Sequence, residues 1–432
     1  MEPILMNIGE NDDFRALFTP QLNKLRKMFE SRNFEMRIAG GAVRDLLMNI
    51  KPADVDFAST ATPTQMKEIF ETEQIRMLHK RGEEHGTITC RIDDVENFEI
   101  TTLRVDVVCD GRRAKVEYTE DWQLDANRRD LTINSLFLCL DGTVVDYFGG
   151  IRDIQARRVA FVGDARQRIQ EDYLRILRYF RFFGRISNTT EHESDTISAI
   201  IENKDGIRGI SGERIWTELK KIVIGRMAAD VVTTMIKDCQ LNILLGLPEE
   251  CNLDRFKNVS KRFEGSLEPM TMIACLCENV EDIASFHKVT KLSNDERFVG
   301  EFVLENRQDA LQNLDNHEYW KEKIVDLEQR PGHDANLEKL RKRVVQLAKS
   351  VGCDEKVLKM IDDYVTPKFP IDGKILMSAG NLQRGPHVRN VLIYLFDLWK
   401  TSKCTMARPE LLDHVNDEDI PIINKKGSPK RV

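Results

Sequence analysis

The 432-residue chain lacks an apolar run of the ~18 residues that a membrane-spanning helix needs. Its opening stretch, with Asp12 and Asp13, has neither the basic-then-apolar pattern of a secretory signal nor the arginine-rich, acid-poor composition of a transit peptide. The nine cysteines include no Cys-x-x-Cys pair, which argues against the usual zinc and redox motifs. We therefore expect an intracellular protein with reduced cysteines, in the cytoplasm or nucleus, and no membrane partner.

The chain also lacks a positive net charge. Asp and Glu number 71 against 64 Lys and Arg, a net charge of −7, which excludes a protein that coats nucleic acid without selection. One stretch is an exception, because residues 151–185 hold nine arginines against four acids. Any RNA partner is therefore expected to meet this local basic patch.

The first third of the chain alternates short apolar segments with helical stretches, which predicts a mixed sheet with helices. The expected strands are 34–39, 53–58, 86–92, 98–103, and a hairpin of 135–140 with 143–147. Beyond Gly150 the apolar spacing becomes helical, with one long helix expected within 167–185. We predict an α+β fold in four parts: a head at 14–150, a helical neck at 151–225, a helical body at 226–350, and a helical tail at 351–432 with a disordered basic end.

A glycine pair stands where the first expected strand runs into a helix. Glycine lets the backbone approach a phosphate, a helix start offers free N–H groups, and an arginine one turn later adds a charge. Gly40, Gly41 and Arg44 supply these features, although an ordinary tight turn has the same glycine signature. The acids that follow favour the phosphate site.

Asp54 and Asp56 stand two positions apart in an expected strand, so both carboxylates point to one face. Two adjacent like charges need a counterion, and oxygen ligands suit Mg²⁺, a pair of which can activate an attacking hydroxyl and stabilise a leaving pyrophosphate. A solvated strand face is the alternative. Beside the glycine pair, we predict a catalytic magnesium site of the kind that serves nucleotidyl transfer.

A third carboxylate from a neighbouring strand is expected to support the ions. Glu99 is the candidate, because it lies in the strand-like run 97–104 with apolar neighbours, where an unpaired carboxylate is unfavourable. An ion pair between Glu99 and Arg91 or Arg104 explains the same pattern equally well.

Two further segments carry charged groups suited to a nucleotide. Arg128, Arg129, Asp130 and Asn134 combine forked phosphate donors with an acid and an amide that can bind ribose hydroxyls, although a charged helix start looks similar. A second segment places polar residues at every third position, which on one helix would form a stripe: Asp172, Arg175, Arg178 and Arg181. An acid and an arginine one turn apart can hydrogen-bond a base edge, so they could select a nucleotide without a template. A salt-bridged surface helix is the alternative.

In this order, and together with Asp146, Gly149-Gly150 and the segment 209–214, these motifs resemble the class II CCA-adding tRNA nucleotidyltransferases, of the eukaryotic or mitochondrial type. The resemblance covers about residues 38–219, and the stretch 369–373 with Trp399 is similar to the tail of that family. Between about 227 and 365 only helical patterns are visible.

The resemblance implies addition of C, C and A to the 3′ end of tRNA from CTP and ATP, with Mg²⁺ as cofactor. Asp54 and Asp56 would bind the metal, and three residues would hold the triphosphate and ribose: Gly41, Arg44 and Arg129. Asp172 and Arg175 would recognise the base, and Arg178 and Arg181 would support that site or bind the phosphates. The segment 105–122 would be a mobile loop that helps change the specificity from C to A, and the helical remainder would grip the acceptor arm.

Two other functions stay open at this point, a bacterial-type poly(A) polymerase and a non-catalytic RNA-binding protein derived from the same fold. The family resemblance also implies a mitochondrial location. Either a monomer or a homodimer fits the sequence.

Overall fold

The computed structural model describes residues 2–78, 86–110, 113–332, 336–379, 382 and 385–421. The chain forms two compact units, Met1–Cys251 with Ser285–Leu292, and Asn252–Ala284 with Ser293–Val432. The predicted basic end at 424–432 lies outside the described residues. Within the described part, no helix has both the length and the apolar character to cross a membrane.

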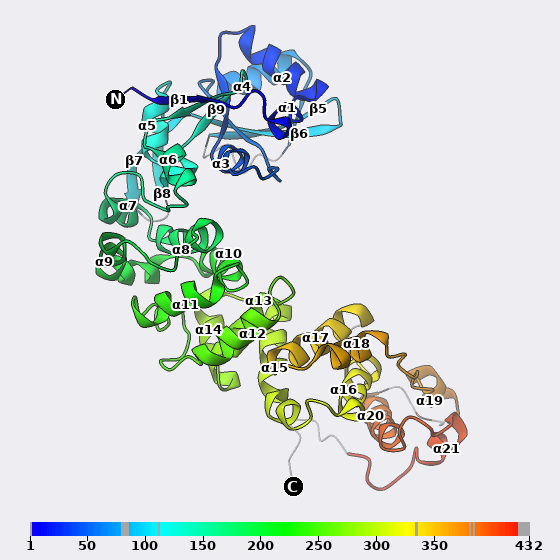
Figure 1. The fold of residues 1–432 in the computed structure, drawn as a ribbon. Coiled ribbons are helices and arrows are strands. Elements are labelled where there is room, and N and C mark those ends of the chain that lie inside the picture. Colours follow the sequence, from blue (N-terminus) through cyan, green and yellow to red (C-terminus); the bar gives the residue numbers. More distant parts are fainter. Residues whose placement is uncertain are drawn as a thin grey trace. The chain divides into compact units, whose positions relative to one another are not determined.

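The first unit begins with a mixed sheet (Figure 1). In spatial order its strands are β1 (Ile4–Asn7), β10 (Thr143–Asp146), β9 (Phe137–Cys139), β2 (Met36–Ala39), β3 (Asp56–Ser59), β6 (Glu96–Thr102), β5 (Thr87–Ile92) and β4 (Arg76–Leu78). Strands β3 and β6 are parallel, and the other described neighbours are antiparallel. With the helices that follow, this sheet confirms the predicted α+β class.

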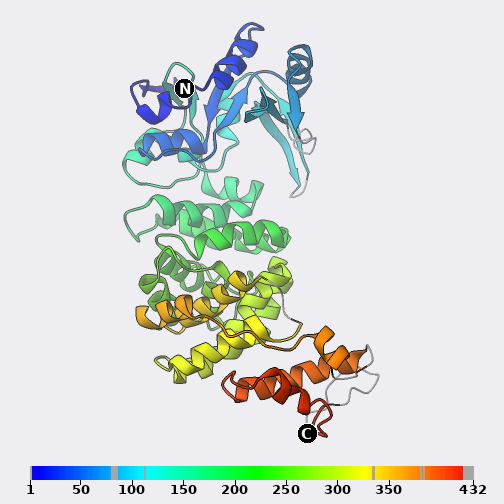
Figure 2. The ribbon, with the colours of Figure 1, turned by 90° about the vertical axis from the view of Figure 1, so that its right-hand side faces the viewer.

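The helices that lie between these strands in the sequence are α1 (Asp12–Arg15), α2 (Pro20–Glu30), α3 (Gly41–Leu47), α4 (Pro63–Thr72) and α5 (Trp122–Asn127). Local signals set their starts, since the Thr19 and Thr62 hydroxyls cap α2 and α4 and a proline occupies the first turn of each. Helices α2 and α4 cover one face of the sheet, where Phe29 meets Phe70, and α3 lies on the other (Figures 1 and 2). The face beside α3 therefore stays open for a site.

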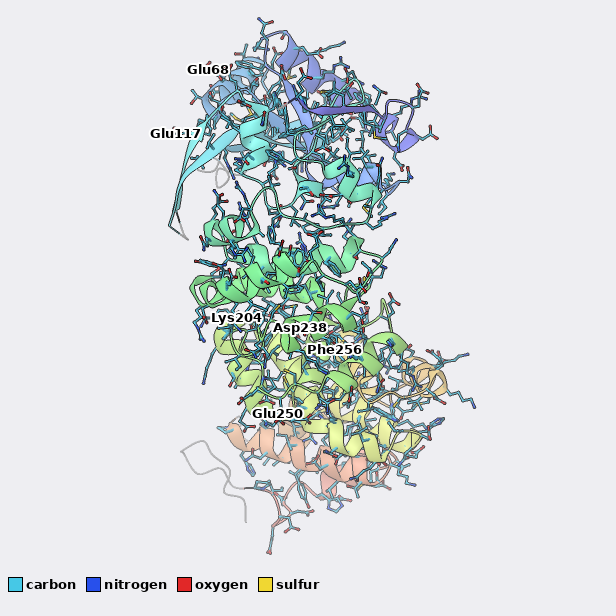
Figure 3. All side chains as sticks on the ribbon, turned by 60° about the vertical axis from the view of Figure 1, so that its left-hand side comes forward. Glu68, Glu117, Lys204, Asp238, Glu250 and Phe256 are labelled. Carbon is cyan, nitrogen blue, oxygen red and sulfur yellow. The ribbon has the colours of Figure 1, made fainter. Side chains whose placement is uncertain are left out.

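Two strands form a separate hairpin, β7 (Arg104–Asp110) and β8 (Arg113–Tyr118), which Figure 2 shows extending from the head. Exposed Glu117 of β8 is labelled in Figure 3. The prediction of a loop over 105–122 is therefore wrong for the backbone. In this segment, charged residues alternate with β-branched valines, and that alternation favours strands over a loop.

Helices alone make up the rest of the first unit. They are α6 (Gly150–Gln155), α7 (Ala165–Glu171), α8 (Leu174–Ile186), α9 (Ser194–Asn203), α10 (Gly212–Ile222) and α11 (Ala228–Lys237), with short 3-10 turns at Thr132–Asn134 and Lys204–Gly209. Helix α8 buries Leu177, Phe180 and Phe183 among its neighbours, as its spacing predicts. Lys204, after α9, donates to the Cys239 carbonyl beyond α11 at 3.0 Å, close to labelled Asp238 (Figure 3).

Every regular element described in the second unit is a helix. Its helices are α12 (Leu253–Arg262), α13 (Pro269–Leu276), α15 (Asn294–Gln312), α16 (His317–Gln329), α17 (Leu337–Ser350), α18 (Glu355–Asp363), α19 (Gly373–Ala379), α20 (Pro386–Thr401) and α21 (Arg408–Asp413), while α14 (Val280–Thr290) passes from this unit into the first. Toward the C-terminus the core is aromatic, with the Phe369 ring 5.3 Å from Trp399 and 5.5 Å from Phe396. The stretch 369–373 therefore has a packing role.

Candidate active site

An open cavity of about 1240 Å³ lies in the first unit, between the open face of the sheet and helix α8. The candidate catalytic and nucleotide-binding residues all line it: Gly40, Gly41, Arg44, Asp54, Asp56, Glu99, Arg128, Arg129, Asp130, Asn134, Asp172, Arg175, Arg178 and Arg181. Residues from distant parts of the sequence are thus brought to one place, as a single site requires.

The glycine pair forms the turn from β2 into α3. Gly40 has φ +65°, which L side chains rarely adopt, and a Cβ there would lie 3.1 Å from an Arg129 nitrogen. The Gly40 N–H donates to the Leu136 carbonyl and is not free, which differs from the expectation of an open N–H cradle. The glycine therefore serves to bring the backbone close to the Arg129 guanidinium.

Three carboxylates gather at the edge of β3. The strand begins at Asp56, so Asp54 lies in the segment just before it and the predicted strand 53–58 starts too early. Asp56 is directly opposite Glu99 on parallel β6. Burial raises the pKa of Asp56 and of Glu99 above their usual values, and the charges of neighbouring carboxylates raise both pKa values further.

This acidic group suits a hard cation. Oxygen donors favour Mg²⁺, and the mutual repulsion that raises these pKa values is relieved by a bound positive charge. Among the described residues no set of three or more His, Cys, Asp and Glu side chains forms a complete metal site. Proteins usually hold Mg²⁺ through one or two carboxylates together with water and substrate phosphates, so the pair Asp54 and Asp56 fits that pattern.

Arg91, one of the alternative partners of Glu99, instead donates to the Asn97 side chain at 2.9 Å. Arg104, the other, lines the cavity together with Glu99. Glu99 therefore faces the site, close to the charges of Asp54 and Asp56.

The two arginines after α5 share one carboxylate that the sequence analysis missed. Asp125 is 1 % exposed and accepts from Arg128 Nε at 2.8 Å and from Arg129 Nη2 at 3.0 Å. Arg129 Nη1 also donates to the Asn134 carbonyl. A carboxylate three and four residues before two arginines is a recognisable ion-pair spacing, so this signal was available in the sequence.

A chain of hydrogen bonds joins the head to α8. Arg44 Nη1 donates to Asn134 Oδ1 at 2.6 Å, the Asn134 amide reaches Asp130 at 3.4 Å, and Arg178 Nε donates to Asp130 Oδ2 at 2.6 Å. Burial alone would raise the pKa of Asp130, but the Arg178 charge and hydrogen bond hold that pKa below its usual value. Arg44 also pairs with Asp45, so most of its donors are used within the protein.

The prediction of one continuous helix over 167–185 is wrong, because the helix is interrupted at Asp172, between α7 and α8. This residue has φ −155° and ψ 105°, and its side chain accepts from the Leu174 N–H at the start of α8. Short acids compete in this way with helical hydrogen bonds. Asp172 therefore sits between two helices, with its other oxygen 2.6 Å from Arg214 on α10.

Arg175, although on α8, is not a free surface group. It donates to Glu171, to the Arg168 carbonyl and, at 2.8 Å, to the Arg128 carbonyl. The last contact links the predicted base-reading residue to the arginine pair of the head. Its orientation is thereby fixed from both sides of the cavity.

At the far end of α8, Arg181 pairs with Glu218 of α10 at 2.9 Å. Burial lowers the pKa of Arg181 to about 10, against the raising effect of Glu218. The Phe182 ring lies under the guanidinium groups of Arg44, Arg178 and Arg181 at 4.2–5.7 Å. Glu218 carries no motif of its own in the sequence and was missed.

The predicted basic patch at 151–185 is largely neutralised. Seven of its nine arginines lie within ion-pair distance of a carboxylate: Arg158, Arg166, Arg168, Arg175, Arg178, Arg181 and Arg185. Several of these acids come from outside the stretch, including Asp45, which accepts from Arg185. A local count of charges therefore overstates the positive surface.

Comparisons with known proteins give a consistent result. Residues 36–160 match the family described as "Poly A polymerase head domain", and residues 191–249 match "Probable RNA and SrmB- binding site of polymerase A". The fold is similar to that of a Bacillus stearothermophilus CCA-adding enzyme solved with CTP, with a TM-score of 0.71, 22% sequence identity, and coverage of 94% of this chain and 97% of that one.

Two mitochondrial proteins named CCA tRNA nucleotidyltransferase 1 are similar in sequence over nearly the whole chain. The mouse protein is 46% identical and the human protein 45% identical, each over 411 residues that cover 94% of this chain and 92% of the relative. At this identity and coverage, the chain belongs to the family of CCA tRNA nucleotidyltransferases.

Proposed function

We propose that this protein adds C, C and A to the 3′ end of tRNA from CTP and ATP, without a template, and releases pyrophosphate. The observation that carries the proposal is one open cavity lined by three carboxylates, by the paired arginines Arg128 and Arg129, and by Asp172 and Arg175. These are the parts that phosphoryl transfer and base selection need. Membership of the family supports the same activity.

The residues take separate roles in this proposal. Arg129, held against the Gly40 turn, binds the triphosphate, because a guanidinium fork bonds two phosphate oxygens at once. Arg128, bonded to Asp125, and Asn134 hold the surroundings of Arg129 in place, and Arg44 supports Asn134 through a hydrogen bond to its side chain. Gly40 and Gly41 let the nucleotide approach the backbone.

Asp54 and Asp56 would hold Mg²⁺, with Glu99 beside them as the third carboxylate. When bound, two such ions lower the pKa of the attacking 3′ hydroxyl and neutralise charge that develops on pyrophosphate. The pairing of β3 with β6 sets Asp56 opposite Glu99, and these acids line the same cavity as the arginines that would orient the triphosphate.

Asp172 and Arg175 are the proposed readers of the incoming base. Arg175 is anchored by Arg128 and Glu171, and Asp172 by Arg214, so both present fixed donors and acceptors. Arg178 and Arg181 support them through Asp130 and Glu218. Replacing Asp172 by Asn should change the ratio of CMP to AMP incorporation by about tenfold and leave metal dependence unaltered, since one base contact is worth roughly 1–3 kcal/mol.

The acceptor arm and 3′ end of tRNA are the proposed partner. RNA helices are recognised chiefly by shape and phosphate contacts, which suits a long helical remainder better than a short motif. The match of residues 191–249 to a probable RNA-binding site supports this assignment within the first unit. The four-part division into head, neck, body and tail stays part of the proposal.

A nucleotide-restriction assay tests the function. With labelled CTP alone and a tRNA that lacks its terminal CCA, incorporation should stop after two residues, and one further AMP should follow when ATP is supplied. Chelation of divalent cations with EDTA should stop both steps. Indifference to CTP with long A tracts would favour a poly(A) polymerase, and no incorporation at all would favour a non-catalytic RNA-binding protein.

The names of the mouse and human relatives lead us to propose a mitochondrial location as well. The full-length native protein should then co-purify with the mitochondrial matrix and resist external protease. Recovery solely in cytosolic or nuclear fractions would contradict this location without affecting the activity.

A further inference from the structure

Helix α5 places one buried carboxylate where three parts of the site meet. Asp125 Oδ1 accepts from Arg128 and from the backbone N–H of Arg104 at 3.1 Å, and its Oδ2 accepts two donors of Arg129 at 3.0 and 3.2 Å. Arg104 is the first residue of β7. One side chain therefore joins the base of the hairpin to both arginines of the cavity wall.

Through the two arginines, Asp125 is linked both to the proposed triphosphate site and to the proposed base-reading residue Arg175. With Nε and Nη2 used by Asp125, Arg129 turns its Nη1 toward the Asn134 carbonyl and the Gly40 turn. The carbonyl of Arg128 accepts from Arg175, the proposed base reader. A planar guanidinium bonded along one edge has little freedom left at the other, so its partner sets its direction.

Charge explains why a carboxylate is needed at this point. Two arginines next to each other repel, and a buried carboxylate between them offsets that repulsion. Burial would raise the pKa of Asp125, but the charges of Arg129 and Arg128 hold the pKa below its usual value. Asp125 is thus an anion behind the arginines.

We propose that Asp125 is a positioning residue for nucleotide binding: it orients Arg129 toward the triphosphate, fixes the Arg128 carbonyl that holds Arg175, and ties both to the start of the β7–β8 hairpin. This inference rests on the proposed function, because it acts through the triphosphate role of Arg129. Asp125 itself has no contact with the reacting atoms in this proposal.

The test is the steady-state kinetics of single CMP and AMP additions by the full chain. Asp125→Asn removes the charge with little change in size, and it should raise KM for both CTP and ATP by roughly tenfold, as losses of supporting contacts do. It should change kcat much less, because Arg129 holds the triphosphate in the ground state and the transition state alike. A merely structural defect would lower kcat through loss of active enzyme and leave KM unchanged.

A double-mutant cycle shows whether the effect runs through Arg129. In an Arg129→Gln background, adding Asp125→Asn should raise KM by less than about twofold, whereas independent effects would multiply. Asp141→Asn is the matched control: exposed Asp141, in the turn between β9 and β10, is not among the residues that line the cavity, and asparagine can replace its hydrogen bond from the Thr143 N–H at 2.8 Å. Its KM values should equal those of the wild type.

If Asp125→Asn does not fold, Asp125→Glu provides a second variant that keeps the charge but displaces both arginines. It should also raise KM for CTP and ATP, by a smaller factor. Unchanged KM in a folded Asp125 variant, or multiplicative effects in the double variant, would overturn this inference while the wild type still adds C, C and A. A wild type that adds no nucleotide would overturn both proposals.

Discussion

The two walls of the cavity deal with charge in opposite ways. On the sheet, Asp54, Asp56 and Glu99 lie near one another, and the pKa values of Asp56 and Glu99 are raised. On α8, by contrast, Arg178 and Arg181 are each matched to a carboxylate from another element. The carboxylates of the first wall repel one another in the folded protein, whereas each of these arginines on the second wall has a counter-charge beside it.

This difference teaches what each wall contributes. Carboxylates whose pKa values are raised in the folded state reduce stability at neutral pH, and such groups persist at sites that bind a ligand. Groups that are fully paired hold a geometry and stabilise the fold. Removing one acid from each wall should therefore have opposite effects on stability.

The largest effect is expected for Asp56→Asn. Loss of this proposed metal ligand should reduce CMP incorporation by about 1000-fold, as for removal of a major electrostatic stabiliser, while tRNA binding is retained. Because the repulsion with Asp54 is also removed, the free energy of unfolding at pH 7 should rise. Radiolabelled incorporation, filter binding of tRNA and urea unfolding measure the three quantities.

Asp94→Asn is the matched control on the same head. Asp94 has a side chain that is 78% exposed, with ion-pair distances of 3.8 Å to Arg76 and Arg91. Its activity and stability should match those of the wild type. Near-normal turnover by Asp56→Asn would remove the metal-ligand assignment.

Glu218→Gln is the corresponding change on the other wall. Glu218 is 4% exposed and pairs with Arg181, so neutralising it leaves a buried guanidinium without its counter-charge. The free energy of unfolding should fall by about 3 kcal/mol, which urea denaturation detects. A rise in stability, as expected for Asp56→Asn, would mean that the two walls do not differ in the way described.

Glu99→Gln should have a smaller effect on activity than Asp56→Asn. A carboxylate that supports a metal without being a principal ligand typically contributes 10- to 100-fold, so kcat should fall by about that factor. Titration with Mg²⁺ should show a higher concentration for half-maximal activity. If activity and Mg²⁺ dependence are both unchanged, Glu99 has only a structural role in the sheet.

Residue patterns predicted the parts of the site that depend on nearby sequence. Asp54 and Asp56 both line the cavity, although β3 starts at Asp56 and the predicted two-residue strand repeat therefore does not include Asp54. The paired glycines mark the turn into α3 because Gly40 needs a positive φ. The expected strands 34–39 and 86–92 differ from β2 and β5 only at their ends.

Features that depend on distant partners could not be predicted in this way. Strand β1 is four exposed residues whose only described sheet neighbour is β10, more than a hundred residues later. Arg185 pairs with Asp45 across a similar separation, so a local count of arginines could not show that its charge is offset. The interruption of the helix at Asp172 could not be predicted without knowing that its side chain accepts from the Leu174 N–H.

The smallest predicted effect concerns the pH dependence of stability around helix α8. His192 accepts or donates a hydrogen bond with the Tyr179 hydroxyl at 2.9 Å, and its ring stacks on Phe183 with centroids 3.8 Å apart. Burial lowers the pKa of His192 to about 4, from a usual value of 6.5. Between these two values the unfolded chain binds a proton that the folded chain does not, so stability should fall as the pH decreases from 6.5 toward 4.

His192→Phe removes this titration and keeps an aromatic ring against Phe183, so the variant should lose less stability than the wild type between pH 7 and pH 5. Thermal unfolding at both pH values measures the difference. On the sheet wall the sign is reversed, because Asp56 and Glu99 bind protons more readily in the folded state and repel each other less when protonated. The variant Asp56→Asn should therefore lose more stability on acidification than the wild type, and a change of the same sign in both variants would contradict the opposite pKa shifts of Asp56 and His192.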